Sequence, residues 1–363
     1  MKLKRCVNML YPILFAPIYK EMVWGGTRMM QFNKKSNENK KDKTNIRELP
    51  YEHTGESWDI SCRPNEMGIV ENGSFKGTTF ESLIALDRKA YLGTRLHERD
   101  DFPLLVKIID ANDNLSIQVH PGGENGKSEM WYVMDALKDQ SLVIGLNEGT
   151  TPEMLQNSPL SCLHRLPIKK GDIINIPAGL VHALTKGIIV AEIQQNSDTT
   201  YRLYDYERTG LDGKPRELHI QEGLAVSDFQ NKHPKEVVIG LSFVNGAENT
   251  ARLTYAIANS YFAVIKYEIN GLYAEDSNTE AFSIFTCVEG SCEISSATDK
   301  FETVTLPCSR SVFIPAGLGS YTLNGNCVLL KSFVPDVQKD FIEPLLSRGF
   351  PITDIKFQTQ FDL

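Results

Sequence analysis

Hydrophobic and polar positions alternate in the segment LSIQVH, Leu115–His120. Side chains two residues apart share one face of a strand, so Ser116, Gln118 and His120 are expected together on one face. A Pro/Gly/Asn-rich loop follows, and Lys127 and Glu129 then lead into an apolar run. Taken alone, this pattern favours a half-exposed hairpin with solvated polar side chains.

The apolar spacing elsewhere predicts mostly strands with a few helices. Helical periodicity predicts a helix over Thr79–Leu92, and the continuous β-rich run Phe102–Ala111 predicts a buried strand. Thr-Pro-Glu at Thr151 is typical of a helix start, and this helix is expected to reach Leu155 and to resume after Pro159 as far as Leu166.

The same interpretation of apolar spacing and turn residues applies to the start of the chain and to the segment after residue 190. Tyr11–Met29 predicts a strand pair leading to a turn at Gly25-Gly26, and Gln31–Asn45, rich in Asn and Lys, predicts a mobile loop. Ala191–Ile220 predicts a strand with a turn-rich tail that ends in a short helix near Ile220–Phe229. Residues 230–250 are expected to connect to a second unit.

A second motif, KKGDIINIPAGLVHAL, changes the interpretation of the first. Its spacing of Gly171, Pro177, Gly179 and His182 resembles the second conserved motif of the cupin β-barrels, in which the histidine is a metal ligand. Glycine permits tight turns, and proline ends a strand without needing a ladder hydrogen bond. A mixed set of nitrogen and oxygen donors upstream suits zinc or a similar divalent ion.

The second half of the chain repeats this motif incompletely. IPAGL at Ile314–Leu318 matches Ile176–Leu180, and Phe285–Ile294 upstream predicts a β-hairpin. The position equivalent to His182 is Ser320. We therefore expect a mainly β protein of two jelly-roll-like cupin barrels, with a few helices inserted in or flanking the first. Residues 1–235 would form the metal-binding catalytic domain, and residues 236–363 a degenerate barrel without metal.

Composition limits the partners. The 363 residues carry a formal net charge of −8 and no basic block, which argues against nucleic acid and means that an anionic substrate needs locally placed cations. No segment reaches the roughly 20 apolar residues of a membrane helix. The basic and apolar start imitates a signal peptide, but Pro12 and Pro17 interrupt it and no cleavage site follows. Seven scattered cysteines favour reduced thiols, so we expect a cytoplasmic protein, either monomer or homodimer.

Five motifs in order carry a family resemblance: FPLLVKIIDA, LSIQVHP, GKSEMWYV, IPAGLVHAL and EIQQNSDTTYRLYDYER. With them the chain resembles a type I mannose-6-phosphate isomerase of the short bacterial form. The resemblance implies a zinc-dependent two-cupin enzyme, with one Zn²⁺ per chain, that interconverts mannose 6-phosphate and fructose 6-phosphate.

The same resemblance implies site residues. The zinc ligands fall on four positions: Gln118, His120, Glu129 and His182. The active-site arginine falls on Arg202, the lysine before the ligand glutamate on Lys127, and the serine before the ligand glutamine on Ser116. Longer family members have a phosphate-binding lysine where this chain has Arg208, which keeps the cation.

Aldose–ketose isomerisation requires these residue types. Removing a proton beside a carbonyl creates an anionic enediolate, which a Lewis acid stabilises. Arg202 would stabilise the same charge, and Lys127 would move a proton between oxygens if the metal depresses its pKa. Glu192 and Asp198 are both candidates for the base, and Asp198 also for a substrate contact. For both carboxylates, a solvated or structural ion pair is an equally good interpretation.

Two other functions fit part of the pattern. A metallocupin of different chemistry, such as an iron dioxygenase or an enzyme of another sugar phosphate, would share the histidines, but a dioxygenase needs open positions that Gln118 would fill. A non-catalytic sugar-binding cupin would share the fold. All four ligand positions and Arg202 are present, which favours the isomerase.

Overall fold

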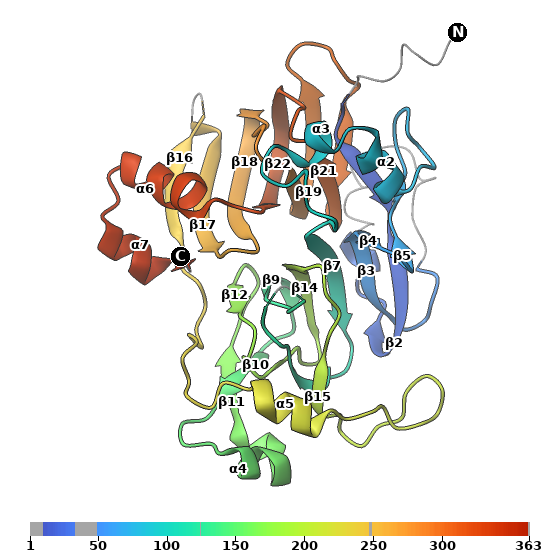
Figure 1. Cartoon of the computed structure of the whole chain (residues 1–363), viewed down its shortest axis with the longest axis vertical. Coiled ribbons are helices and arrows are strands. Elements are labelled where there is room, and N and C mark those ends of the chain that lie inside the picture. The colour runs from blue at the N-terminus through green and yellow to red at the C-terminus, as the bar shows by residue number, and fades with distance from the viewer. Residues whose placement is uncertain (1–9, 33–48, 124, 247–248, 362–363) are drawn as a thin grey trace.

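Strands dominate the computed structural model, which describes residues 10–32, 49–123, 125–246 and 249–361 (Figure 1). Within these residues the strands form three large sheets and one two-stranded sheet, β4 (Cys62–Arg63) with β5 (Glu66–Met67). The prediction of a mainly β fold is confirmed.

The N-terminal region contains two of the large sheets, drawn in the lower half of Figure 1. The six-stranded sheet runs in the order β12 (Ile173–Ile176), β9 (Glu129–Ala136), β14 (Ile188–Gln195), β7 (Leu104–Ala111), β2 (Ile18–Gly26) and β3 (Thr54–Ile60). The five-stranded sheet runs in the order β11 (Leu163–Pro167), β10 (Ser141–Leu146), β13 (His182–Ala183), β8 (Ile117–Val119) and β15 (Tyr201–Tyr204). Both sheets contribute to one apolar cluster, in which Trp131 and Val190 meet Leu142 and Ile144.

The third sheet belongs mainly to the C-terminal region. Its order is β16 (Leu241–Asn245), β17 (Ala251–Ala258), β18 (Ala263–Asp276), β22 (Ser320–Phe333), β19 (Ser283–Ser296), β21 (Arg310–Ile314), β1 (Ile13–Ala16) and β6 (Ile69–Val70), with β20 (Val304–Pro307) on β19 and β23 (Gln360–Phe361) on β17. β1 and β6 come from the start of the chain, so this sheet is completed by distant sequence. The predicted division at residue 235 stays a prediction, and the first 70 residues contribute strands to both regions.

Short helices lie between and beside the sheets. They are α2 (Phe80–Leu86), α3 (Arg88–Leu92), α4 (Pro152–Asn157), the 3₁₀ turn η3 (Pro159–Cys162), α5 (Ile220–Val226), the π-type turn η5 (Val337–Ile342), α6 (Glu343–Ser347) and α7 (Ile352–Gln358). Among the described residues none of them is long and apolar enough to cross a membrane. The cytoplasmic location stays a prediction.

Two helix predictions need correction at their ends. The helix expected over Thr79–Leu92 breaks at Asp87, because this residue takes an extended φ of −160° and its carboxylate caps α3 by accepting from the Ala90 N–H. The helix that begins at Thr151 does resume after Pro159, but it ends at Cys162, and the remaining residues to Leu166 belong to β11. The predicted N-cap is confirmed, since the Thr151 hydroxyl accepts from the Met154 N–H.

Three strand predictions also change. Phe285–Ile294 is not a hairpin but part of the single strand β19, which passes through an irregularity after Cys287 and a positive φ at Gly290. β1 and β2 exist as predicted but pair with other strands rather than with each other. The expected connection 230–250 contains β16, and the predicted short helix is α5. Most of the loop predicted over Gln31–Asn45 lies outside the described residues.

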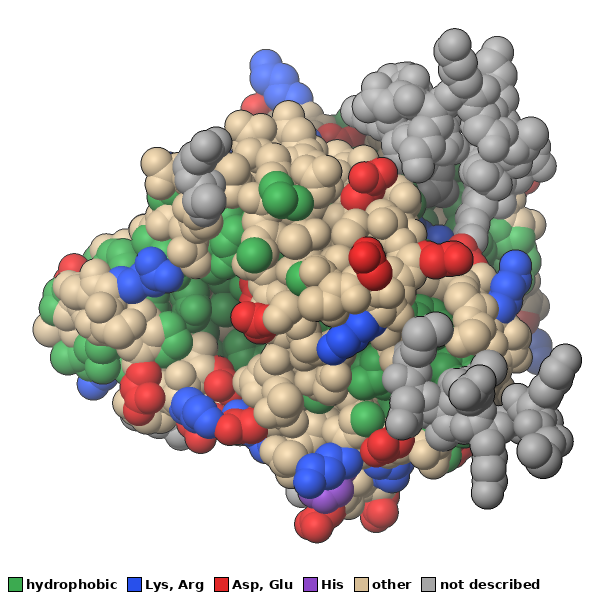
Figure 2. Space-filling view, turned by 90° about the horizontal axis from the view of Figure 1, so that it is seen from above, with side chains coloured by type: hydrophobic (Ala, Val, Ile, Leu, Met, Phe, Trp, Pro, Cys, Tyr) green, Lys and Arg blue, Asp and Glu red, His purple; other side chains and the backbone are tan. Residues whose placement is uncertain are grey.

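The surface agrees with the charge argument. Acidic and basic side chains are interspersed over the face shown in Figure 2, and no broad basic area lies on that face. Six cysteines lie in the described residues, and no disulfide joins them. This face therefore gives no support to nucleic-acid binding.

Candidate metal and substrate site

Three buried side chains converge between the two N-terminal sheets. His120 follows β8, Glu129 begins β9 and His182 begins β13, and one ligand atom of each lies within 4.8 Å of the others. Glu129 Oε2 is 3.7 Å from His120 Nε2, and Glu129 Oε1 is 3.4 Å from His182 Nε2. Two imidazoles and a carboxylate at this spacing form a donor set suited to a divalent metal.

Backbone carbonyls fix the tautomer of both histidines. His120 Nδ1 lies 2.8 Å from the Thr199 carbonyl oxygen, and His182 Nδ1 lies 2.8 Å from that of Leu180. A carbonyl only accepts, so Nδ1 carries the proton in each ring and Nε2 presents its lone pair to the shared centre. Burial is the largest cause that lowers the pKa of His182, to about 4, and also lowers that of His120, which keeps both rings neutral as metal ligation requires.

Glu129 has an unsatisfied atom at this centre. Its Oε1 is buried and has no hydrogen-bond partner among the described residues, although its Oε2 accepts from Lys127. Burial and then the charge of Glu192 raise the pKa of Glu129 above its ordinary value. A buried carboxylate oxygen without a partner is costly, and a cation between the three donors would satisfy it.

Gln118 lies beside this triad on β8. Its Nε2 is 3.3 Å from His182 Nε2, and its Oε1 accepts from the Ser116 hydroxyl at 3.2 Å. A ligand role for the amide oxygen needs the opposite amide orientation, which differs only in the assignment of oxygen and nitrogen. The residue is therefore in place as a fourth donor.

The site consists of two rows of side chains, one on each N-terminal sheet, whose members lie side by side because of the strand register. On the five-stranded sheet, Gln118 pairs with His182 on one side and with Arg202 on the other. On the six-stranded sheet, Glu192 pairs with Lys107 and with Trp131. Directly opposed residues of neighbouring strands point to the same side. Members of both rows line one pocket of about 330 Å³.

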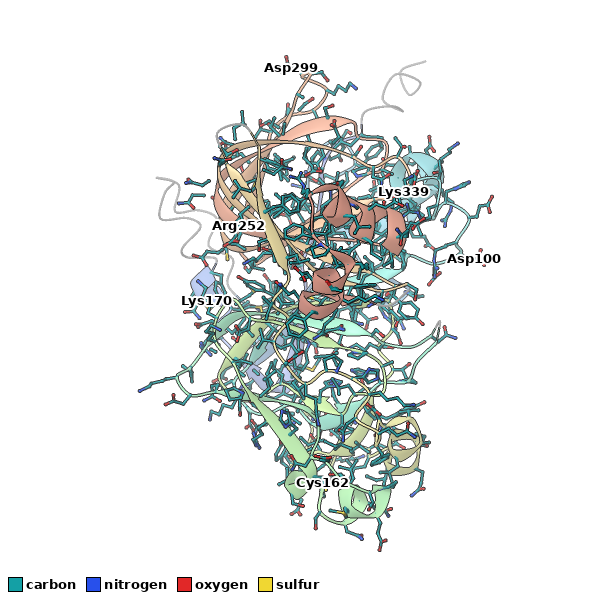
Figure 3. The ribbon with its side chains drawn as sticks, turned by 90° about the vertical axis from the view of Figure 1, so that its left-hand side faces the viewer. Asp100, Cys162, Lys170, Arg252, Asp299 and Lys339 are labelled. Carbon is teal, nitrogen blue, oxygen red and sulfur yellow. The ribbon has the colours of Figure 1, made fainter. Side chains whose placement is uncertain are left out.

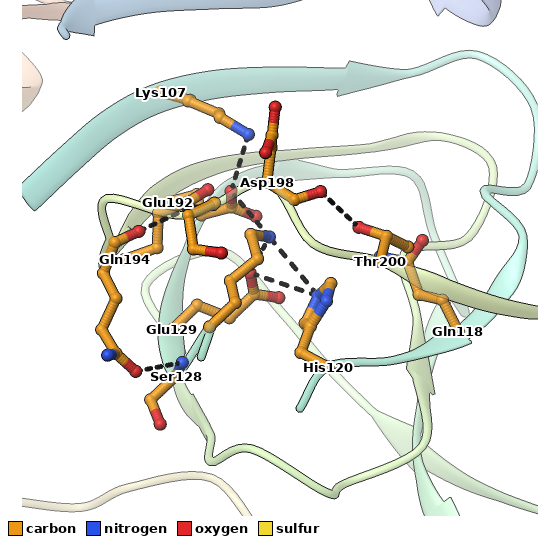
Figure 4. Close-up of polar contacts among 12 residues, drawn as sticks. Lys107, Gln118, His120, Ser128, Glu129, Glu192, Gln194, Asp198 and Thr200 are labelled. Carbon is orange, nitrogen blue, oxygen red and sulfur yellow. Dashed lines mark hydrogen bonds and ion pairs between the residues drawn. The ribbon is translucent and has the colours of Figure 1, made fainter. Parts of the chain in front are cut away.

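A buried charge network crosses the pocket floor (Figure 4). Lys107 and Lys127 each approach Glu192 Oε1 at 3.5 Å, and the Trp131 indole donates to Glu192 Oε2 at 2.8 Å. Burial alone would raise the pKa of Glu192, but Lys127 and Lys107 outweigh it and lower that pKa. Burial likewise lowers the pKa of Lys127, whereas Glu129 and Glu192 raise it to a net value above the ordinary one. The effect of a bound metal ion on the pKa of Lys127 stays a prediction.

Comparison with known proteins identifies the family. The catalytic domain of phosphomannose isomerase type I matches residues 13–148, and the cupin domain of mannose-6-phosphate isomerase matches residues 251–334. The mannose-6-phosphate isomerase ManA of Bacillus subtilis (strain 168) is 34% identical over 329 residues, which are 86% of this chain and 96% of ManA. The chain belongs to the type I mannose-6-phosphate isomerases.

Further relatives agree. The mannose-6-phosphate isomerase of Streptococcus mutans is 30% identical over 333 residues, covering 88% of this chain and 98% of that protein. A crystal structure of the mannose 6-phosphate isomerase from Bacillus subtilis is 32% identical, with a TM-score of 0.75, and the match covers 88% of this chain and 99% of that one. The resemblance stated from the sequence motifs and the cupin fold class are both confirmed.

Five of the six predicted catalytic and substrate-binding residues of this isomerase line the pocket, together with the predicted metal ligand Gln118. The five are Ser116, Lys127, Glu192, Asp198 and Arg202. Arg202 donates to the Glu217 carbonyl at 2.7 Å, and burial, followed by the charge of Arg216, lowers its pKa. Asp198 pairs with Arg63 at 2.8 Å, and its side chain is 59% exposed.

Arg208 is the exception. Its guanidinium donates to Asp205 and to the Asn114 carbonyl, and it is not among the residues of the pocket wall. The phosphate contact that the resemblance implies for Arg208 stays a prediction, since in this geometry the buried Asp205 holds the guanidinium outside the pocket lining. Arg216, held by the same Asp205, does line the pocket.

Several lining residues were missed or left open by sequence reasoning, among them Glu56, Trp58, Lys107 and Arg216. The Trp58 indole donates to Glu56 at 2.5 Å, and Lys107 lies over the Trp58 ring at 4.6 Å. A lysine within the apolar run FPLLVKIIDA was an available signal, since buried lysines are rare unless paired. Arg216 sits in a turn-rich tail that gives no periodic signal.

Proposed function

We propose that this isomerase works with one zinc ion held by four residues: Gln118, His120, Glu129 and His182. The observation that supports this most directly is the unsatisfied Glu129 Oε1 facing two histidines whose Nε2 lone pairs point to the same centre. The donors are of the type that zinc prefers. A bound zinc would polarise the sugar carbonyl and stabilise the enediolate.

The family reaction interconverts mannose 6-phosphate and fructose 6-phosphate by moving a proton between neighbouring carbons. Glu192 is the better placed of the two predicted bases, because its carboxylate lies in the buried part of the pocket lining and its Oε1 has no hydrogen-bond partner among the described residues. Asp198, mostly exposed and paired only with Arg63 in the described ion pairs, is suited to accept from substrate hydroxyls. Lys127 is suited to hold or donate a proton at a sugar oxygen.

The cations on the pocket wall suit an anionic sugar. Arg202 stands opposite Gln118 and would stabilise negative charge that develops on the substrate oxygens. Ser116 lies two residues from Gln118 in the same pocket. Arg216 takes the phosphate-side position that the sequence assigned to Arg208, and a guanidinium binds phosphate bidentately.

Metal analysis tests the ligand assignment. We expect about one divalent ion per chain in the purified protein, loss of both the ion and the turnover in His182→Ala, and retention of both in Ser320→Ala. Ser320 is exposed and donates to Asp276 at the surface, so it offers a matched control in the second copy of the motif. Full metal content in His182→Ala would overturn the assignment.

A further inference from the structure

A second cavity, of about 360 Å³, lies in the C-terminal region. Strands β16, β17, β18 and β22 form its walls, and η5 and α6 lie over it; Figure 3 faces these helices, with Lys339 labelled on η5. It shares none of its lining residues with the pocket at the metal site. Its volume is within the range of small-molecule sites, about 300–1,000 Å³.

Aromatic rings form much of its wall. Tyr255, Tyr267 and Tyr273 are each more than nine-tenths buried, and Phe243 packs against Tyr255 with ring centroids 5.7 Å apart. Tyr273 accepts a hydrogen bond from Asn245 at 3.1 Å. Rings with polar edges provide both flat apolar surfaces and hydroxyl groups to a ligand.

Charged groups lie among these rings. Glu275 and Lys331 pair at 3.1 Å, with side chains only 13% and 14% exposed, and both line the cavity. Glu275 Oε2 is buried and has no partner among the described residues. This open carboxylate oxygen in the cavity lining favours a polar occupant that donates hydrogen bonds.

The lining charges restrict the chemistry of that occupant. Glu275 pairs with Lys331, and Asp340 pairs with Arg95 outside the lining, which leaves Arg348 as the cation of the lining that no ion pair of the described residues engages. A metal ion is disfavoured, because the lining residues include no histidine or cysteine, and Asp340, the second carboxylate beside Glu275, already pairs with Arg95 at 2.6 Å. A purely apolar ligand would leave the Glu275–Lys331 pair further desolvated.

We propose that this cavity binds a monosaccharide ring, separate from the catalytic site. The tyrosine rings would pack against the C–H faces of the sugar, while Glu275 and Lys331 meet its hydroxyls. Arg348 stacks on Phe243 at 3.7 Å, and no ion pair of the described residues engages it. The Arg348 guanidinium, which lines the cavity, would bind the phosphate group of a sugar phosphate.

The two pockets have separate reporters. All three tryptophans of the chain line the catalytic pocket, which contains no tyrosine, whereas three tyrosines line the second cavity. Holoenzyme with ¹³C-labelled tyrosine rings is titrated with mannose and, separately, with mannose 6-phosphate, while tryptophan fluorescence follows the catalytic site. We expect saturable shifts of the Tyr255, Tyr267 and Tyr273 signals with a midpoint different from the tryptophan midpoint.

Variants locate the binding. Glu275→Gln should weaken the sugar affinity, measured as the midpoint of the tyrosine shifts, about tenfold, which is the usual loss for a hydrogen bond to a charged group. Isomerase turnover should stay unchanged. Glu293→Gln, at an exposed position of β19, should change neither. If Glu275→Gln does not fold, Tyr273→Phe provides the same comparison through the other two tyrosines.

Arg348→Ala distinguishes the two sugars. If Arg348→Ala loses affinity only for mannose 6-phosphate, the ligand is a sugar phosphate. If the variant and the wild type bind each sugar equally well, the ligand is the neutral sugar ring. Tyrosine signals that stay unshifted by either sugar, at concentrations of mannose 6-phosphate that saturate the tryptophan signal, would overturn the proposal.

Discussion

We expect Arg202 to act on the transition state rather than in substrate binding. It is the strand neighbour of Gln118, and its guanidinium is anchored by the Glu217 carbonyl. We expect Arg202→Ala to keep its metal and to lose about a hundredfold or more in kcat, with a smaller change in KM. Arg202→Lys should rescue little, because an ammonium lacks the planar fork. Steady-state kinetics with metal analysis checks this, and a rise in KM alone would make Arg202 a binding residue.

Arg216 and Arg208 form a matched pair, since Asp205 holds both and only Arg216 lines the pocket. Arg216→Ala should raise KM for mannose 6-phosphate about tenfold or more, with little effect on the slow reaction of free mannose. Arg208→Ala should affect both sugars equally and weakly. A larger phosphate-specific loss in Arg208→Ala than in Arg216→Ala would restore the assignment made from the sequence.

Among the individual site residues, those on or beside regular strands could be predicted from the sequence. Gln118, Glu129 and His182 follow from spacing, because strand alternation and a Gly/Pro motif fix where they point. Arg216 does not follow, because its position depends on an ion pair with Asp205, eleven residues away across a turn-rich segment. Lys107 depends on pairing between strands that the sequence does not specify.

The end of α3 depends on one glycine. Gly93 has φ of +90°, and a Cβ there would lie 2.3 Å from the Glu280 backbone. Gly77 has the same φ, with nothing within 4 Å of its Cβ position. Both alanine variants place a side chain at a positive φ, which costs about 1–3 kcal/mol, but Gly93→Ala should lose about 1–3 kcal/mol more through the clash. Urea unfolding measures the difference, and equal losses would contradict the close approach.

Element types were easier to predict than their ends and partners. The N-cap at Thr151 is a local hydrogen bond and was predictable, whereas the break at Asp87 required knowing that its carboxylate caps the next helix. Cys287–Gly290 has the composition of a turn, yet β19 continues because β22 pairs with it on both sides of the irregularity. Tertiary pairing here overrides a local turn signal.

The two regions of the molecule share an aromatic cluster. Phe80 of α2 is fully buried, with ring centroids 4.4 Å from Phe15, 4.7 Å from Phe102 and 5.2 Å from Phe313. Phe80→Ala should cost about 3–5 kcal/mol of unfolding free energy. Because the cluster joins β1 and β21 of the C-terminal sheet to Phe102, which lies just before β7 of the N-terminal region, the loss should shift one common transition.

Two probes test that coupling. Tryptophan fluorescence reports the N-terminal pocket, and circular dichroism reports all strands, so coincident urea midpoints are expected in the wild type and in Phe80→Ala. Phe357→Ala, at a side chain that is 83% exposed, should change stability by no more than about 0.5 kcal/mol. A tryptophan midpoint that does not move in Phe80→Ala would show that the regions unfold independently.

At the scale of the whole chain, the internal repeat indicated two similar units but not how they are joined. The repeat compares residues 176–180 with 314–318, and neither copy contains the segment that connects the regions. β1 and β6 enter the C-terminal sheet through pairings that carry no sequence signature. Where one unit ends therefore could not be derived from composition.

The place of β1 in this sheet has a consequence for synthesis on the ribosome. Leu14 pairs with Val312, so 298 residues of chain separate the two partners. At about 5–20 residues per second, Ile13 and Phe15 emerge roughly 15–60 s before β21 exists. Through that interval β1 has neighbours such as β6 and β3, while its edge toward β21 stays unpaired, and we expect a chaperone that binds apolar strands to engage the growing chain there.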